Sequence, residues 1–384
     1  MKVVFVTGML PSGHYSQYIA HGLVETKKVE LLVYTDKDEK NLIIKGCGQI
    51  IPVWSKSFKF IFEVLKQLRQ DKPDIVHFQH ELNMYGGMFT AALFPLLLLL
   101  TKLLGYKIVV TVHAAVFKKQ IDDEFVRIFN QNPKIIRPFM LKTFFSYVYH
   151  SISLISNIMI VHTHLTKKII TQDYGVDGTK VHVIPAVIPE KKPYTGKTDP
   201  YFFYFGYMAR RKGLGYALDG FKKYIETNPK SKFKLILAGG VIKGQEDSLR
   251  EITDMITKSG LEQRIVYKGF IEEKAQDDLY HKAYCVIIPA VLSMGSSGPL
   301  YHANSYGKCI IATKIGHYLE DIDDGKTGIL TDNDKWDQAF DMVVNNPSQV
   351  KQIEKNTMQK ATDRKPITIA RQYNSIYSQL INRN

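Results

Sequence analysis

Short apolar runs rich in β-branched residues alternate with longer amphipathic segments along almost the whole chain. This alternation constrains the fold strongly, because a strand–helix–strand unit places its two strands parallel in one sheet with the helix against a face. In the first half the candidate strands are Val3–Thr7, Val29–Tyr34, Ile75–Gln79, Lys107–Val112, Ile158–Val161 and Lys180–Ile184. The pattern predicts an α/β protein built on parallel sheets.

The alternation is interrupted once, after Pro185, by the proline-rich stretch AVIPEKKPYTGKTDP. It then resumes with the apolar runs YFFYFGYM, FKLILAGG, RIVYKGF, YCVIIPA and CIIATKI. Because 384 residues exceed what one core usually holds, we expect two Rossmann-like domains facing each other across a cleft. The predicted bounds are 1–190 and 201–365, joined by a linker at 191–200, with a C-terminal helix at 366–384 that packs back on the first domain.

The chain is strongly basic, with a formal net charge of +14 that is concentrated in its first half. Residues 1–195 hold 24 Lys and Arg against 15 Asp and Glu, whereas the remainder holds 27 against 22. Such a field attracts anions in general, including nucleic acid, acidic lipid and nucleotide-linked substrates. Because no nucleic-acid-binding module is recognisable in the sequence, we expect no nucleic-acid partner.

Two basic stretches carry apolar side chains at helical spacing. The helix predicted from Trp54 to Leu68 also carries Lys56, Lys59 and Lys66, and the stretch 134–150 mixes Lys134, Arg137 and Lys142 with aromatic residues. Basic amphipathic surfaces bind anionic membrane interfaces. The alternative is that the apolar faces pack in the core and the lysines are solvated.

Cysteine usage and hydropathy point to a cytoplasmic protein. Cys47, Cys285 and Cys309 are far apart in the sequence, which suits a reducing compartment. The N-terminal run MKVVFVTG reads as a first strand rather than as a signal peptide. The most apolar segment, which begins at Met88, contains Pro95 and Lys102 and is expected to be a buried helix rather than a transmembrane span.

Polar residues follow several of the candidate strands, where ligands bind in doubly wound sheets. Gly8 and Gly13 flank a loop that opens a helix; a phosphate cradle and a simple tight turn explain this spacing equally well. His113 ends one strand, and His77, His80 and Glu81 lie at the end of another. His113 and Glu81 are the candidate catalytic residues. None of these has the companion spacing of a zinc site, so we expect no metal.

Two loops of the second half are candidate phosphate sites. Arg210, Arg211 and Lys212 precede a helix, where adjacent cations oppose the helix dipole unless an anion is bound. The second candidate is the Ser/Gly-rich loop LSMGSSGPLYH, which opens a helix with Pro299 in its first turn. The expected donor-binding residues in this loop and helix are Ser297, Gly298, Pro299, Leu300 and His302.

These motifs together resemble the retaining GT-B glycosyltransferases of glycosyltransferase family 4. FGYMARRKGL is similar to the family's phosphate loop, and GPLYHANSYGKCIIATKIGHYLEDIDDGKTGIL is similar to its donor-site segment, with Glu320 and Gly325 in place. TVHA is similar to the segment that carries the pocket histidine, here His113. The resemblance implies sugar transfer from a nucleotide-sugar donor, UDP- or GDP-linked, to a glycan or lipid-linked acceptor, without a metal.

The chain departs from the family pattern at two positions. The family usually carries two glutamates in the donor segment, which hold the transferred sugar and the nucleotide ribose, and Met294 and His302 stand at those positions here. The phosphate-loop arginine is Tyr207, so Arg210 or Arg211 would replace it. A non-catalytic member that binds nucleotide sugar or membrane is therefore the main alternative. A nucleotide-sugar epimerase of the same fold is a further alternative, for which Glu81 is one of few candidate carboxylates.

Overall fold

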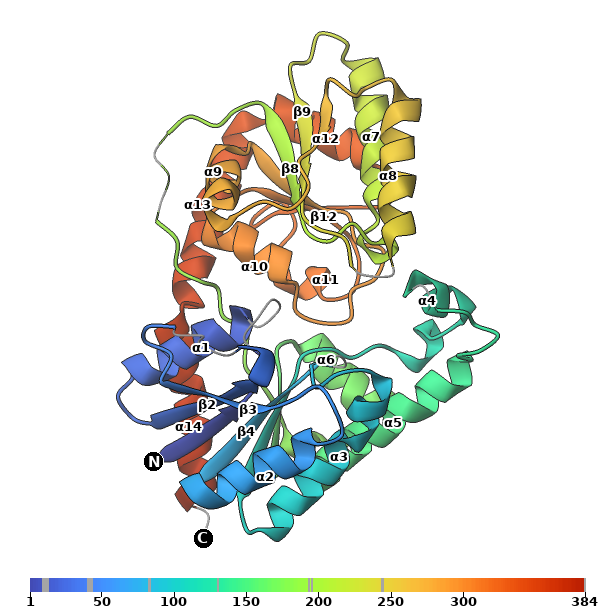
Figure 1. Ribbon diagram of the computed structural model, residues 1–384. Coiled ribbons are helices and arrows are strands. Elements are labelled where there is room, and N and C mark those ends of the chain that lie inside the picture. The colour runs from blue at the N-terminus through green and yellow to red at the C-terminus, as the bar shows by residue number, and fades with distance from the viewer. Residues whose placement is uncertain are drawn as a thin grey trace.

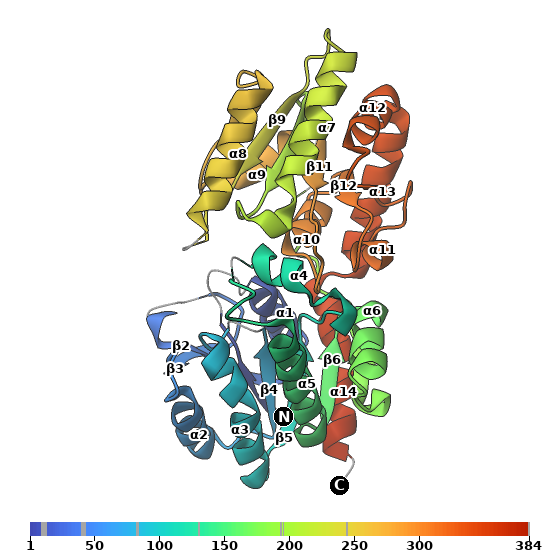
Figure 2. The ribbon, with the colours of Figure 1, turned by 90° about the vertical axis from the view of Figure 1, so that its right-hand side faces the viewer.

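The computed structural model describes residues 1–8, 14–39, 44–81, 84–129, 131–192, 194, 196–242 and 245–382. It contains two α/β domains, one above the other in Figure 1, each built on a single parallel sheet. The predicted fold class is confirmed. The carboxyl ends of the strands of both sheets point toward the region where the domains meet (Figures 1 and 2).

The sheet of the first domain has the strand order β3-β2-β1-β4-β5-β6-β7. Its strands are β1 (Lys2–Val6), β2 (Glu30–Asp36), β3 (Gln49–Trp54), β4 (Ile75–His80), β5 (Lys107–Val112), β6 (Ile158–Val161) and β7 (Val181–Val183). The helices are α1 (His14–Glu25), α2 (Phe60–Asp71), α3 (Met88–Leu103), α4 (Asp123–Ile128), α5 (Pro138–Ile155) and α6 (His164–Lys168). The central strands are buried on both faces, which explains their unbroken runs of Val and Ile.

The sheet of the second domain has the order β10-β9-β8-β11-β12-β13. Its strands are β8 (Tyr201–Phe205), β9 (Lys234–Ala238), β10 (Ile265–Tyr267), β11 (Cys285–Ile288), β12 (Ile310–Thr313) and β13 (Ile329–Thr331). The helices are α7 (Leu214–Thr227), α8 (Glu246–Ser259), α9 (Glu273–Lys282), α10 (Gly298–Ser305), α11 (Tyr318–Asp321), α12 (Trp336–Asn345) and α13 (Pro347–Asp363). The strand order reverses between β8 and β11, so the loops after these two strands are neighbours.

The last helix, α14 (Pro366–Asn382), leaves the second domain and lies along the first, beside α1 (Figure 1). Gly22 on α1 permits the close approach, because a Cβ there would lie 2.3 Å from the carbonyl oxygen of Pro366. The hydroxyls of Tyr15 on α1 and Tyr373 on α14 are 2.7 Å apart. The end of the chain therefore becomes part of the first domain's core.

Helices α2, α3 and α5 cover the other face of the first sheet. Trp54, which the sequence placed on the α2 helix, ends strand β3, and Ile61, Leu65 and Leu68 are buried in the core, whereas Phe58 is 57% exposed. Most of this apolar face therefore packs in the core. Helix α3, expected to be buried, is buried on only one side: Leu97 is inaccessible, whereas Leu103 is 73% exposed. Within the described residues, no helix combines the length and the apolarity needed to cross a bilayer.

Candidate functional site at the domain interface

The loops after β8 and β11 meet at the carboxyl edge of the second sheet. The backbone N–H of Val291 donates to the carbonyl of Arg211 over 3.1 Å. Gly213 allows this contact, because its φ is +62° and a Cβ there would lie 1.9 Å from the carbonyl oxygen of Pro289. The structure thus brings together the basic loop and the Ser/Gly-rich loop, the two anion-binding candidates of the sequence.

The three cations of the basic loop have different surroundings. Arg210 is exposed and forms an ion pair with Glu251 on α8, with its Nε 3.2 Å from the carboxylate. Lys212 is half-buried, and its partial loss of hydration, together with the neighbouring positive charge of Arg211, lowers its pKa to about 7. A partly desolvated ammonium with a lowered pKa is stabilised by a bound anion. Lys212 and Arg211 are therefore better placed for a phosphate than Arg210.

Helix α10 begins at the end of the Ser/Gly-rich loop. Ser297 caps it by accepting a hydrogen bond from the backbone N–H of Leu300 (3.4 Å), and the hydroxyl of Tyr318 lies 3.3 Å from the same serine oxygen. Around Gly298 the space within 4 Å of a hypothetical Cβ is open. The first turn of α10 therefore presents backbone N–H groups beside the basic loop, which is the geometry of an anion site.

Lys308, which follows α10, has a structural role. Its buried ammonium donates to the carbonyls of His281 (2.7 Å) and Ala283 (3.0 Å), at the C-terminal end of α9. Burial lowers its pKa. Lys308 therefore donates hydrogen bonds to carbonyls at the end of α9 that have no partner within the helix.

The loop before α10 also contacts the first domain. The N–H of Ala115 donates to the carbonyl of Met294 over 2.6 Å, and a Cβ on Gly295 would lie 1.9 Å from the carbonyl oxygen of His113. The side chain of Met294 packs against the core of the first domain. Two loops from different domains are thus held together next to His113.

A second set of contacts joins the domains at α6. The carboxylate of Glu320 accepts from the backbone N–H groups of His164 (2.7 Å) and Leu165 (2.8 Å), at the N-terminus of that helix. His317 bridges the domains, with its Nε2 2.8 Å from Thr166 and its Nδ1 3.2 Å from Ser293. Glu320 therefore caps a helix of the other domain, which favours the closed arrangement.

In the first domain, His113 lies in a chain of polar side chains. Alternate residues of a strand share a face, so His77 and Gln79 of β4 lie beside Thr111 of β5 and His113, which follows it. His113 Nε2 is 2.8 Å from Gln79 Oε1, and His113 Nδ1 is 3.2 Å from His162 Nε2. The ring of Tyr15 packs edge-on against His113. Both ring nitrogens of His113 therefore have protein partners.

The chain continues at both ends. His162 Nδ1 is 3.0 Å from the carbonyl oxygen of Ile184, and Gln79 Nε2 is 3.1 Å from His77 Nε2. His77 Nδ1 is 2.5 Å from the hydroxyl of Tyr377 on α14. Burial lowers the pKa of His77 to about 3 and that of His162 to about 4, and it lowers the pKa of His113 well below its usual value. All three rings are neutral at physiological pH.

Neutral rings allow one consistent set of proton positions. A carbonyl only accepts, so His162 carries its proton on Nδ1 and accepts at Nε2 from His113 Nδ1–H. His113 Nε2 then accepts, which requires the Gln79 amide to be turned so that its NH₂ faces His113. The His77 Nε2–H group then faces two acceptors, the Thr111 hydroxyl oxygen at 2.8 Å and the turned Gln79 amide oxygen, and His77 Nδ1 accepts from the Tyr377 hydroxyl.

We predict that His113 and His162 are Nδ1–H tautomers and that His77 is the Nε2–H tautomer, because only this set pairs every donor with an acceptor. Nitrogen-15 chemical shifts of labelled histidines should show these three states, unchanged across neutral pH because the pKa values lie far below it. An Nε2–H tautomer at His113, or its titration near pH 7, would contradict the proposed chain.

Glu81, the other candidate catalytic residue, follows β4 on the same edge of the sheet. Its side chain is solvent-exposed, yet surrounding protein raises its pKa, while the charge of Arg211 lowers it. The solvent access indicates a carboxylate that can exchange protons, next to a cation of the other domain. Gly13, the remaining donor-binding candidate, lies outside the described residues.

Comparison with known families covers both domains. Residues 13–191 match the family model described as Glycosyltransferase Family 4, and residues 199–345 match the model described as Glycosyl transferases group 1. Each match falls on one domain. The chain belongs to glycosyltransferase family 4.

Individual relatives agree with this placement. The α-1,3/1,6-mannosyltransferase ALG2 of Dictyostelium discoideum is 29% identical over 176 residues, which is 43% of this chain and 42% of that protein's length. Anabaena HepE, solved in complex with UDP, has a TM-score of 0.74 at 15% identity, covering 99% of this chain and 100% of HepE. The sucrose-phosphate synthase of Thermosynechococcus elongatus has a TM-score of 0.77 at 14% identity, covering the whole of both chains. At these identities the two structures establish the shared fold.

Met294 and His302, which the sequence pattern aligns with the two family glutamates, both contact other parts of the protein. Met294 contributes its backbone carbonyl to the domain contact and its side chain to the first domain's core. His302 lies on α10 with its ring stacked over Tyr280 of α9, at a centroid distance of 6.4 Å. Among the residues that the structure describes, no group of three or more His, Cys, Asp or Glu side chains is arranged to hold a metal ion.

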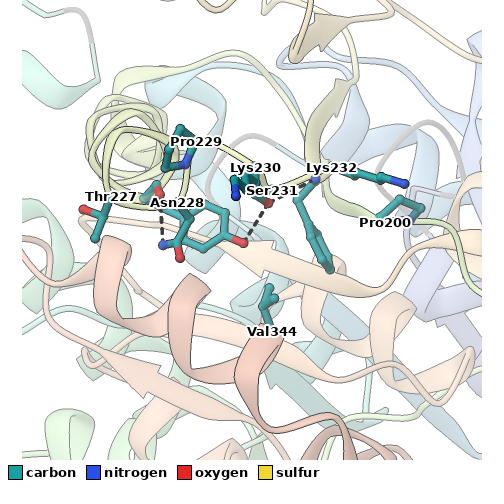
Figure 3. Close-up of a pocket in the computed structure, with 10 residues that line it drawn as sticks. Pro200, Thr227, Asn228, Pro229, Lys230, Ser231, Lys232 and Val344 are labelled. Atoms are coloured by element: carbon teal, nitrogen blue, oxygen red, sulfur yellow. Dashed lines mark hydrogen bonds between the residues drawn. The ribbon is translucent and has the colours of Figure 1, made fainter.

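The second domain also has a surface pocket of about 700 Å³, shown in Figure 3, which is separate from this site. Pro200 and Phe233, which line it, precede β8 and β9. The pocket therefore lies at the amino edge of the sheet, opposite the edge that carries Lys212 and α10. Because of this position, the pocket is not part of the candidate donor site.

Proposed function

We propose that the chain transfers a sugar from a nucleotide-sugar donor to an acceptor hydroxyl with retention of anomeric configuration. The observation that carries the proposal is the meeting, at one domain edge, of the half-buried Lys212, Arg211 and the N-terminus of α10, opposite His113. The leaving nucleoside diphosphate gains negative charge on its β-phosphate, and oriented cations and N–H groups stabilise such charge in an enclosed site. In this proposal a metal ion is not needed.

The first domain would hold the acceptor and orient the sugar. His113 is neutral and both its ring nitrogens are held, by Gln79 and His162, so it would position the donor sugar through contacts of the ring itself rather than act as a strong base. Glu81 lies near Arg211 and is the candidate carboxylate at the reacting end. The contacts made by Met294 and Glu320 keep the domains together, which would shield the donor from water.

For the donor we propose a UDP- or GDP-linked sugar, with the UDP complex of a structural neighbour supporting the former. For the acceptor we propose a glycan or lipid-linked precursor, met in the cytoplasm or at the inner face of a membrane. Three buried free cysteines suit a reducing compartment. A second candidate function, binding of nucleotide sugar without transfer, is favoured by Met294, because a thioether cannot replace the carboxylate that usually contacts the sugar.

Calorimetry of the full chain with UDP, GDP and ADP, and with their sugar conjugates, tests the proposal in the presence and absence of EDTA. We expect one base to bind most tightly and EDTA to leave its affinity unchanged. The selected donor is then incubated with candidate acceptors, and the anomeric configuration of the product is read by NMR. An inverted product would contradict retention, binding of the donor without transfer would support the non-catalytic alternative, and absence of nucleotide binding would overturn both functions.

A further inference from the structure

Exposed apolar side chains gather on one side of the first domain. Of the 18 large hydrophobic residues that are exposed among the described residues, 13 lie between positions 58 and 154. They are Phe58, Phe62, Met88, Phe89, Leu96, Leu99, Leu103, Leu104, Ile135, Phe139, Met140, Tyr147 and Leu154. Scattered surface apolar residues need no explanation, but a concentration of this kind marks an interaction surface.

Most of these side chains form two helical stripes. On α3, Phe89, Leu96, Leu99 and Leu103 follow spacings of seven, three and four residues, so they share one face of the helix. On α5, Met140, Tyr147 and Leu154 repeat every seven residues. The opposite sides of both helices pack in the core. Helix α3 is thus apolar on both sides although water reaches one of them.

The two stripes belong to neighbouring helices. Helices α3 and α5 pack side by side and, together with α2, form the layer on one face of the sheet (Figures 1 and 2). We call the outward side of α3, α5 and the turn at 134–137 the α3/α5 face. Because α3 follows strand β4 and α5 precedes strand β6, both helices begin at the carboxyl edge of the sheet, which is the edge beside the second domain.

The charge around the α3/α5 face is mainly positive. Residues 84–172 contain ten Lys and Arg against three carboxylates, Asp122, Asp123 and Glu124, which lie together at the start of α4. Lys102 stands on α3, and Lys134 and Arg137 precede α5; all three are exposed. Within the described part of the chain, no ion pair with a carboxylate is found for these three cations. The face therefore combines an apolar centre with uncompensated positive charge.

We propose that the α3/α5 face docks on an anionic lipid bilayer, with its apolar stripes in the interfacial region and its cations at the headgroups. Aromatic and aliphatic side chains next to Lys and Arg are the composition of surfaces that lie in a membrane interface. Anionic headgroups complement the charge, whereas a protein partner would have to supply carboxylates along two helices. The geometry fits adsorption on a bilayer rather than a span.

Docking by this face orients the site. Phe89, Phe139 and Met140 lie in the first turns of α3 and α5, at the end nearest the domain interface, so the edge that carries His113 and Glu81 is held close to the lipid surface. This orientation suits a lipid-linked acceptor, and in that respect it rests on the proposed function. The docking itself requires neither donor nor acceptor.

Flotation of the full chain with phosphatidylcholine vesicles, with and without phosphatidylserine, tests the proposal. We expect binding to the phosphatidylserine vesicles, weakened by salt, and little binding to phosphatidylcholine alone. Leu99→Gln with Leu103→Gln should weaken vesicle binding at least about tenfold, because both side chains leave the interface. Phe270→Gln is the matched control: Phe270 is 82% exposed on the second domain, and its substitution should change nothing.

Two triple variants test the contribution of positive charge to vesicle binding. Lys102→Glu, Lys134→Glu and Arg137→Glu together should reduce binding at least about a hundredfold, since each basic residue near an anionic surface contributes about fivefold. Lys230→Glu, Lys232→Glu and Lys274→Glu change the net charge equally on the second domain and should retain most of the binding. Equal losses in the two triple variants would show nonspecific attraction and overturn the assignment to this face.

Two further results would overturn the proposal. One is failure of the unsubstituted chain to float with either kind of vesicle. The other is a concentration-dependent dimer that Leu99→Gln with Leu103→Gln converts to a monomer, which would identify a second copy as the partner. Thermal melts show whether each variant is folded, and calorimetry with the selected nucleotide should give unchanged affinity. Loss of docking with intact nucleotide binding is thereby distinguished from failure of the proposed function.

Discussion

Lys212→Ala is expected to weaken nucleoside-diphosphate binding by about a hundredfold or more, measured by calorimetry. The reason is that Lys212 is a half-buried cation that a bound diphosphate would cover, and removing one partner of a charge pair desolvated on binding costs about 2–5 kcal/mol. Lys212→Met, which keeps the aliphatic stem, should lose as much. If the methionine variant binds normally, the ammonium does not contact phosphate.

Arg210→Ala is the matched control for this loss. Arg210 lies two residues before Lys212 and has the same formal charge, but it is paired with Glu251 on the surface of α8. We expect its replacement to change nucleotide affinity by a few-fold at most, because exposed ion pairs contribute little. Equal losses at the two positions would show that the loop acts only through its overall charge.

Nucleotide binding should also depend on pH through Lys212. In the unliganded chain its pKa is lowered to about 7, so the side chain loses its proton as the pH rises through that value. A bound diphosphate raises the pKa again, which means that binding above pH 7 takes up a proton. We therefore expect affinity to be level below pH 7 and to fall above it. The proton uptake, visible as a buffer-dependent binding enthalpy, should disappear in Lys212→Met.

The sequence predicted most of the fold because the buried strands are uninterrupted apolar runs. Two strands, β3 and β13, were missed, and both lie at the edge of a sheet. Strand β3 contains Pro52, which an edge tolerates because its N–H is not needed on the open side. Strand β13 has only three residues, too few to show a pattern on its own. Edge position and short length do not by themselves prevent prediction, because β7 and β10 are also three-residue edge strands and both were predicted.

The candidate site was predictable where it is local in sequence. The basic loop and α10 could be placed at one sheet edge from the strand order alone. The polar chain around His113 was missed, because its members are distant in sequence. Gln79 and His162 contact His113, and Tyr377 contacts His77, only through the pairing of β4, β5 and β6 and the return of α14. The exposed side of α3 was also missed. A helix that is apolar all round gives no sign in its own sequence of which side the rest of the protein leaves uncovered.

His113→Ala is expected to leave nucleotide affinity within about twofold and to lower transfer by at least about a hundredfold, the loss associated with a misplaced reactant. His113 belongs to the first domain, whereas the phosphate-binding groups belong to the second, so the two effects separate. Initial rates with the selected donor and acceptor measure the loss. It should appear in kcat, because the substitution removes orientation of the sugar more than its binding.

The same variant removes one hydrogen-bond partner from Gln79 and one from His162, which costs about 1–3 kcal/mol of stability. Tyr377→Phe controls for this cost, because it removes one hydrogen bond from the same chain at its far end, on α14, without touching His113. We expect Tyr377→Phe to lower the melting temperature and to keep most of kcat. If it abolishes transfer as His113→Ala does, the chain from α14 to His113 works as one unit, and the closed packing of the C-terminal helix is itself a requirement for turnover. If His113→Ala transfers sugar normally, the reacting carbon lies elsewhere along the interface, and Glu81, with its solvent access and its neighbour Arg211, becomes the residue that defines the reaction centre.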